Sequence, residues 1–167
     1  GTTKPYSSGS PWPQAYTGSL SYDFRKTRII IGDFNARFGQ GLALWNGAFM
    51  TSLSSPDAFM KKPSGISGTW SFTGSSALTG TAVETTVGHF KITALMAVPG
   101  VKEMKKRPEK VSLLPAANLT YLMRYGHASM TYAGSKASID EAFCIRGVNL
   151  FSEAAYDFAE RRIAAVC

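Results

Sequence analysis

Few residues of this chain have the types and spacing that catalysis or metal binding requires. The two histidines, His89 and His127, each follow a glycine in an expected tight turn, which is typical of turn residues rather than of a catalytic pair or metal site. The two cysteines, Cys144 and Cys167, lack a C-x-x-C spacing and fall in expected strands, so their spacing argues against metal binding and does not define a disulfide. No Ser-His-Asp or Cys-His arrangement forms a recognisable local motif. We therefore expect no enzymatic activity and no cofactor.

A glycine-rich turn at Gly39-Gln40-Gly41 is the other feature that could bind a ligand. A phosphate-binding loop needs a strand before it and a helix after it, and no helix is expected here. We therefore interpret Gly39 and Gly41 as backbone positions that allow a bulge or a close approach of two chain segments.

Charged and amide side chains alternate with apolar ones along most of the expected strands. Such residues would line the interior of a barrel, either because they satisfy one another across strands or because they border a pore or substrate path. The expected interior positions are Asp23, Asp33, Asn35, Arg37, Glu84, Lys91, Arg124, Asp140, Arg146, Glu153 and Asp157.

The stretch 28–49 organises the chain. From Arg28 to Phe38 apolar and polar residues alternate, which is the pattern of a strand with one apolar face. We expect its apolar side chains to face lipid and its polar ones to face the interior. The expected lipid-facing residues are Phe34, Ala36 and Phe38, and the expected interior residues are Asp33, Asn35 and Arg37.

The same alternation recurs along the chain and predicts an all-β, antiparallel, up-and-down meander that forms part of a transmembrane β-barrel. Short turns would alternate with longer connections, as in outer-membrane barrels. Residues 1–14 are expected to form a linker or loop, and 15–167 a partial barrel of about nine strands with long loops at 50–80 and 99–115. The last expected strand is still in progress at Cys167, so we expect a longer parent protein. The expected strands are 16–24, 28–38, 81–87, 90–98, 117–125, 128–133, 137–146, 150–158 and 163–167, and the expected short turns are 25–27, 88–89, 126–127 and 147–149.

The chain carries a formal net charge of +7, with 44% hydrophobic and 17% charged residues, which fits a folded protein and not a disordered one. Five of the 18 lysines and arginines fall in the second long loop. This basic loop is either a solvated face or a contact for lipid or lipopolysaccharide phosphates. Its basic residues are Lys102, Lys105, Lys106, Arg107 and Lys110.

One stretch resembles a known family. Gly32-Asp33-Phe34, followed by Phe38-Gly39-Gln40-Gly41-Leu42 and Trp45, is similar to the opening barrel motif of helix-hairpin-helix domain-containing outer-membrane proteins of Gram-negative bacteria. The resemblance covers Gly32–Val98. It implies an outer-membrane location, with structural roles for Gly32, Phe38, Gly39, Gln40 and Gly41. In that family nucleic-acid binding would belong to an N-terminal helix-hairpin-helix domain, similar to competence DNA-binding proteins, that this chain does not include.

Two classes of function follow from these patterns. The first is a bacterial outer-membrane β-barrel in contact with lipid or lipopolysaccharide, serving as a pore or as a component associated with DNA uptake. The second is a lipocalin-like barrel or sandwich in solution that holds an apolar ligand. The two differ in which face of the sheet is apolar: the outside in the first class and the interior in the second. The patterns do not specify an oligomeric state.

Overall fold

The computed structural model describes residues 2–3, 15–16, 18–46, 61, 63–69, 77–99 and 112–167, all as strands and their connections. A two-residue pair of β1 (Thr2–Thr3) and β2 (Ala15–Tyr16) stands apart from one large antiparallel sheet. Within these residues, no helix has the length and apolar character needed to cross a membrane.

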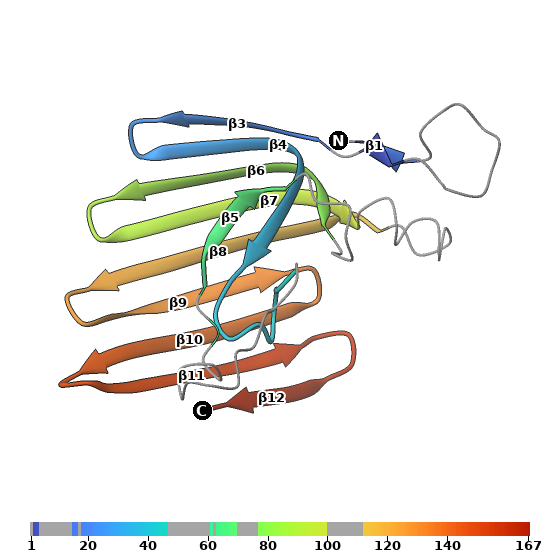
Figure 1. The fold of residues 1–167 in the computed structure, drawn as a ribbon. Coiled ribbons are helices and arrows are strands. Elements are labelled where there is room, and N and C mark those ends of the chain that lie inside the picture. Colours follow the sequence, from blue (N-terminus) through green and yellow to red (C-terminus); the bar gives the residue numbers. More distant parts are fainter. Residues whose placement is uncertain are drawn as a thin grey trace.

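Nine strands of the large sheet follow one another as antiparallel neighbours in chain order, and we call them the wall (Figure 1). The sheet is open, with β3 at one edge and β12 at the other. The predicted all-β up-and-down meander is confirmed. The strands of the wall are β3 (Ser19–Phe24), β4 (Thr27–Arg37), β6 (Leu78–Val87), β7 (Phe90–Pro99), β8 (Leu114–Met123), β9 (Gly126–Ala133), β10 (Lys136–Ile145), β11 (Val148–Asp157) and β12 (Arg162–Val166).

Four two-residue turns lie at one end of the wall, at 25–26, 88–89, 124–125 and 146–147 (Figure 1). The Gly88-His89 turn lies where the sequence predicted it, whereas the last two turns close earlier than predicted. Both residues of the Arg146-Gly147 turn have positive φ angles, 51° and 81°, as a type I′ hairpin turn requires. His127 consequently belongs to β9 and not to a turn.

Successive hairpins of the wall are displaced by a constant amount. Thr27, which closes the β3–β4 hairpin, pairs with Thr85, two residues before the end of β6. In the same way Phe90 of β7 pairs with Tyr121, two residues before the end of β8. Gly126 of β9 pairs with Phe143, two residues before the end of β10. This shift of two residues per hairpin equals one residue per strand. In a closed barrel, a register shift of one residue per strand corresponds to strands tilted by about 36° from the barrel axis.

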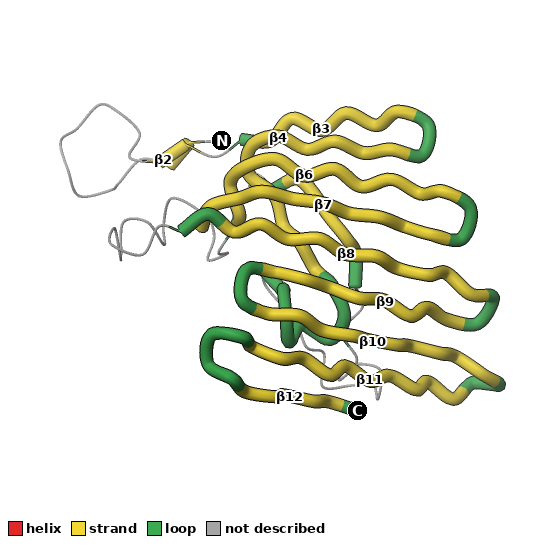
Figure 2. Tube along the Cα trace, turned by 180° about the vertical axis from the view of Figure 1, so that it is seen from behind, coloured by secondary structure: helices red, strands yellow, loops and turns green. Residues whose placement is uncertain are grey.

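The strand β4 takes part in two layers because it bends at Gly32. Gly32 has a φ of +105°, and a Cβ atom there would collide with the carbonyl oxygen of Gly18. Up to Gly32, β4 pairs with β3, and from Phe34 to Arg37 it pairs with β5 (Gly65–Gly68) instead. This second half of β4 crosses one face of the wall together with β5 (Figures 1 and 2). We call residues 33–46 and 63–69 the inner layer, and the wall face that it covers the inner face.

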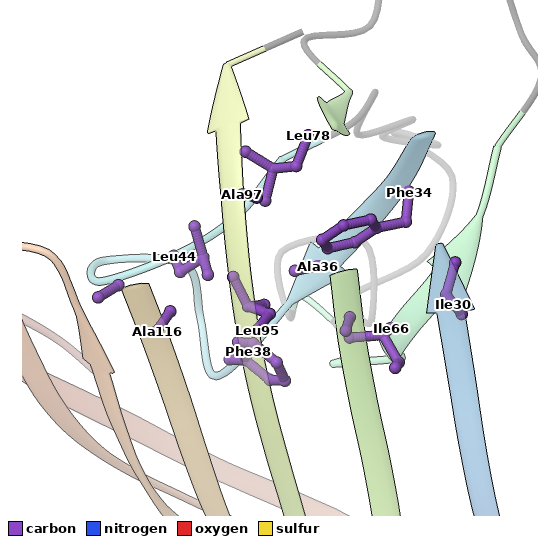
Figure 3. Close-up of a cluster of buried hydrophobic side chains, with 12 residues drawn as sticks. Ile30, Phe34, Ala36, Phe38, Leu44, Ile66, Leu78, Leu95, Ala97 and Ala116 are labelled. Carbon is purple, nitrogen blue, oxygen red and sulfur yellow. The ribbon is translucent and has the colours of Figure 1, made fainter. Parts of the chain in front are cut away.

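Apolar side chains of the inner layer and of the wall form the core between them (Figure 3). The predicted lipid exposure of Phe34, Ala36 and Phe38 is therefore wrong: their exposed fractions are 0%, 0% and 4%. Strand alternation separates two faces correctly but does not say which face is outside. The core residues are Ile30, Phe34, Ala36, Phe38, Leu44, Ile66, Leu78, Ala82, Leu95, Ala97, Ala116 and Ala133.

The opposite, outer face of the wall exposes large apolar side chains from every strand. Register pairs such as Ile92 with Leu119 and Met130 with Ile139 continue this face across neighbouring strands. Among the described strands, Glu141 is the one exposed charged residue on it, and the hydroxyl of Ser152 donates a hydrogen bond of 3.2 Å to its Oε1. The outer face is thus an almost uninterrupted apolar surface.

Candidate functional site

Beyond the apolar core, the inner face carries a band of buried polar side chains across β7 to β11. Strand register places Thr93, Asn118 and Thr131 side by side on three neighbouring strands. The Asn118 side-chain amide donates to the Thr131 hydroxyl at 2.9 Å and accepts from the Thr120 hydroxyl at 2.8 Å. Buried polar groups are stable when hydrogen-bonded in this way, and the inner layer excludes solvent from them.

Two carboxylates form the centre of this band. Asp140 of β10 and Glu153 of β11 are direct register partners and are only 3% and 1% exposed. Asp140 accepts a hydrogen bond from the Ser129 hydroxyl, and its Oδ2 lies 3.4 Å from Nε2 of His127. Glu153 Oε2 accepts a 3.1 Å hydrogen bond from the backbone N–H of Leu42. The carboxylate pair is therefore a point where the wall holds the inner layer.

The glycine at position 39 makes this close approach feasible. Gly39 has a φ of +55°, and a Cβ atom there would lie 2.9 Å from Cδ of Glu153 and 3.0 Å from Oδ1 of Asp140. The expectation that Gly39 is a backbone position agrees with this geometry. Gln40 connects the inner layer to Lys61, which precedes its second segment: the Gln40 side chain donates to the carbonyl of Lys61 at 3.0 Å and accepts from the N–H of Lys61 at 2.9 Å.

A second contact between the layers lies at the ion pair of Lys91 and Glu84, whose Nζ and Oε2 atoms are 3.0 Å apart. The same Glu84 oxygen accepts from the N–H of Ile66 at 3.4 Å. Gly65, with a φ of +69°, lies so close that a Cβ atom would collide with this carboxylate. Glu84 therefore connects Lys91 of the wall to the backbone of β5.

A cavity of about 110 Å³, lined by both polar and apolar side chains, remains between the two layers. Its size suits a few water molecules and is below that of usual small-molecule pockets, which begin near 300 Å³. Among the described residues, no group of three or more His, Cys, Asp and Glu side chains is arranged to hold a metal ion. The cavity is lined by Phe38, Gly39, Pro63, Gly65, Lys91, Asn118, Thr120, Leu122, His127 and Ser129.

The residues predicted to line an interior divide into three groups. Glu84, Lys91, Asp140 and Glu153 lie on the inner face. Asn35 and Arg37 alternate with the core residues of β4, and Arg37 lies with its guanidinium carbon 5.8 Å from the centre of the Trp45 ring. Of the others, Asp23 is exposed and pairs with Arg28, and Asp157 accepts hydrogen bonds from the backbone of the turn that follows it.

Asp33 is buried at the bend of β4, where its carboxylate accepts from the N–H of Gly18 at 2.9 Å and from the hydroxyl of Thr79 at 2.5 Å. Arg124 and Arg146 are exposed turn residues because the turns close earlier than predicted. The basic-loop residues Lys102, Lys105, Lys106, Arg107 and Lys110 lie outside the described residues.

Sequence reasoning missed His127, which the predicted turn removed from the inner face. The signal available was its parity in β9: His127, Ser129 and Thr131 alternate with the outer residues Ala128 and Met130. Cys144 and Cys167 are both free and exposed.

Comparison of the chain with protein-family models, with curated proteins and with solved structures finds no match.

Proposed function

We propose that the wall spans a lipid bilayer as part of a β-barrel, with its outer face against lipid and the inner layer inside. The observation that carries this proposal is the exposure of large apolar side chains over the whole outer face: Leu20 is 69% exposed, Met130 57% and Ile139 63%. Proteins in water seldom expose a contiguous apolar surface larger than a few hundred Å². A bilayer removes this cost because acyl chains replace water around the side chains.

The dimensions of the wall support the same proposal. Five of its strands (β6, β7, β8, β10 and β11) have ten residues, within the roughly 9–11 residues of a membrane-spanning strand. Ten residues at about 3.3 Å each and a tilt of about 36° cover a height of about 27 Å. The apolar band of outer-membrane barrels is about 25 Å tall.

Both edges of the wall would have to be paired inside a membrane. Hydrocarbon offers no hydrogen-bonding groups, so an open edge at β3 or β12 would leave backbone N–H and C=O groups unsatisfied. The proposal therefore includes further strands, beyond those described, that close the sheet against β3 and β12.

The inner layer favours a plugged interior over an open pore. It covers the inner face through the core, the Leu42–Glu153 hydrogen bond and the Glu84–Lys91 contact. We propose a non-enzymatic component of the bacterial outer membrane in contact with its lipids. A transport role, including one in DNA uptake, would require the inner layer to move away from the wall.

The alternative class, a barrel in solution with an apolar ligand cavity, receives less support. Such a barrel would present a polar outside, whereas here the exposed face is apolar and the polar band is buried. A pocket of about 290 Å³ on the inner side, bordered by Lys61, Ala142 and Asn149, is only at the lower limit for a small-molecule site.

Two leucines of β8 offer a matched test, since Leu119 on the outer face and Leu122 on the inner face are 44% and 39% exposed. Leu119→Cys and Leu122→Cys would be made in a background in which Cys144 and Cys167 are changed to serine. Each variant would be labelled with an environment-sensitive fluorophore and reconstituted into vesicles. Brominated acyl chains should quench the label at position 119, and aqueous iodide the label at position 122.

Equal quenching of the two positions by both agents would contradict the proposal. Loss of the sheet signal in far-UV circular dichroism would identify a variant that had not folded, and a label at Met130, also on the outer face, would then replace position 119.

A further inference from the structure

The short-turn rim, which comprises the four turns 25–26, 88–89, 124–125 and 146–147 and two residues on either side of each, is strongly basic. Three of its turns carry the exposed residues Arg25, Lys26, Arg124 and Arg146. The one carboxylate of the rim, Asp23, is already paired with Arg28 at 2.7 Å. Among the described residues, none of the four turn cations forms an ion pair.

Aromatic side chains lie next to two of these cations and near the rim on the outer face. The guanidinium carbon of Arg25 is 5.3 Å from the centre of the Phe24 ring, which lies on the outer face. That of Arg124 is 5.2 Å from the centre of the ring of Tyr125, a turn residue that borders a pocket with Lys61 and Pro63 on the inner side. Phe90 and Tyr121 pack against each other on neighbouring strands with their ring centres 5.1 Å apart. On the outer face, the spatial order from the rim towards the middle of the wall is therefore cation, aromatic ring and then aliphatic side chains.

This order matches the layers of a membrane interface. Aromatic rings favour the boundary between headgroups and acyl chains, while arginine and lysine extend towards the headgroup phosphates. An arginine guanidinium binds phosphate oxygens through paired N–H donors. We propose that the short-turn rim binds the headgroups of anionic phospholipids in the leaflet next to it, an inference that rests on the proposed membrane location of the outer face.

A nucleic acid would also be attracted to a cationic rim. The position of Arg25 favours lipid, because it lies over the Phe24 ring, which belongs to the continuous apolar outer face. Binding of a nucleic acid in water would not account for the exposed apolar side chains of that face.

Spin-labelled lipids give a direct test. In the reconstituted protein, the electron paramagnetic resonance spectrum separates lipids held at the protein surface from bulk lipids, and the ratio for phosphatidylglycerol over phosphatidylcholine measures selectivity. We expect a ratio of about 2–5 at low salt, because one cation near an anionic surface contributes at most roughly fivefold. The ratio should fall towards 1 as salt screens the charges.

The rim variant would combine Arg25→Asn, Arg124→Gln and Arg146→Asn. Asparagine is chosen at 25 and 146 because their φ angles are 52° and 51°, a region that asparagine tolerates well. The matched control removes three cations from the opposite end, by Lys136→Gln, Arg161→Asn and Arg162→Gln, where Arg161 also has a positive φ of 54°. The rim variant should lose the selectivity, and the control should keep it.

Equal selectivity in the parent and the rim variant would overturn the proposal, as would an equal loss in the control. A ratio of 1 in the parent, together with salt-dependent binding of a DNA duplex that the rim variant lacks, would assign the rim to nucleic acid and also overturn it. Absence of any surface-held lipid in the parent would instead contradict the membrane location itself. Circular dichroism of each variant identifies any that fails to fold.

Discussion

Replacement of Phe34 by alanine tests the position of the inner layer most directly. Phe34 is fully buried, at 0% exposure, between β4 and the wall. Removing its ring forfeits the transfer free energy of the buried side chain and leaves a cavity that the sheet can fill only in part. For a phenylalanine in such a place the loss is about 3–5 kcal/mol of unfolding free energy. Phe34→Leu keeps most of the volume and should cost less than about 1.5 kcal/mol.

The measurement is urea unfolding of the reconstituted protein, followed by circular dichroism and by the shift in gel mobility between folded and unfolded forms. Leu122→Ala is a suitable comparison because Leu122 also lies on the inner face but is 39% exposed. Its loss should be well below that of Phe34→Ala. A loss below about 1 kcal/mol for Phe34→Ala, with an unchanged cooperative transition, would refute the packing of the inner layer on the wall.

Two other changes test how the inner layer is attached. Gly32→Ala should prevent assembly of the sheet, because its Cβ would collide with the Gly18 carbonyl. Gly88→Ala, also at positive φ but with open space around it, should cost only about 1–2 kcal/mol of unfolding free energy. Equal yields of folded protein for the two variants would contradict this expectation. Glu153→Gln should retain the hydrogen bond from Leu42, while Glu153→Ala leaves that N–H unpaired at a cost of about 1–3 kcal/mol. Amide hydrogen exchange at Leu42 should therefore be faster in the alanine variant than in the glutamine variant, and equal rates would argue against the contact.

The strands of the wall follow from the sequence because each has a period of two and ends near a turn residue. Leu20, Tyr22, Ile92 and Met130 are exposed on one face as the alternation requires. Turn positions were less accurate: alternation continues smoothly through Arg124, and only the backbone shows that the chain reverses there. His127 was misplaced for the same reason.

The inner layer could not be derived from the pattern of β4 alone. Ile30 and Phe34 have the same parity, and both are buried, so the bend at Gly32 leaves no trace in the alternation. The glycine signals were informative about backbone geometry: Gly39 and Gly41 have φ angles of +55° and +89°. Which carboxylates they would approach depends on contacts between residues far apart in the chain, and local sequence does not encode these.

The pairing at the base of the inner layer has a consequence for how the chain is built. Phe34, where β4 leaves the wall, is the register partner of Leu78, where β6 begins. The excursion 35–77 thus starts and ends at one rung of the ladder, as an insertion into a β-hairpin would. Because its ends already meet, a short connection between Phe34 and Leu78 could replace it without changing the strand order of the wall. Such a shortened chain would expose Leu95 and Ala116, which the insertion now covers, to whatever fills the interior.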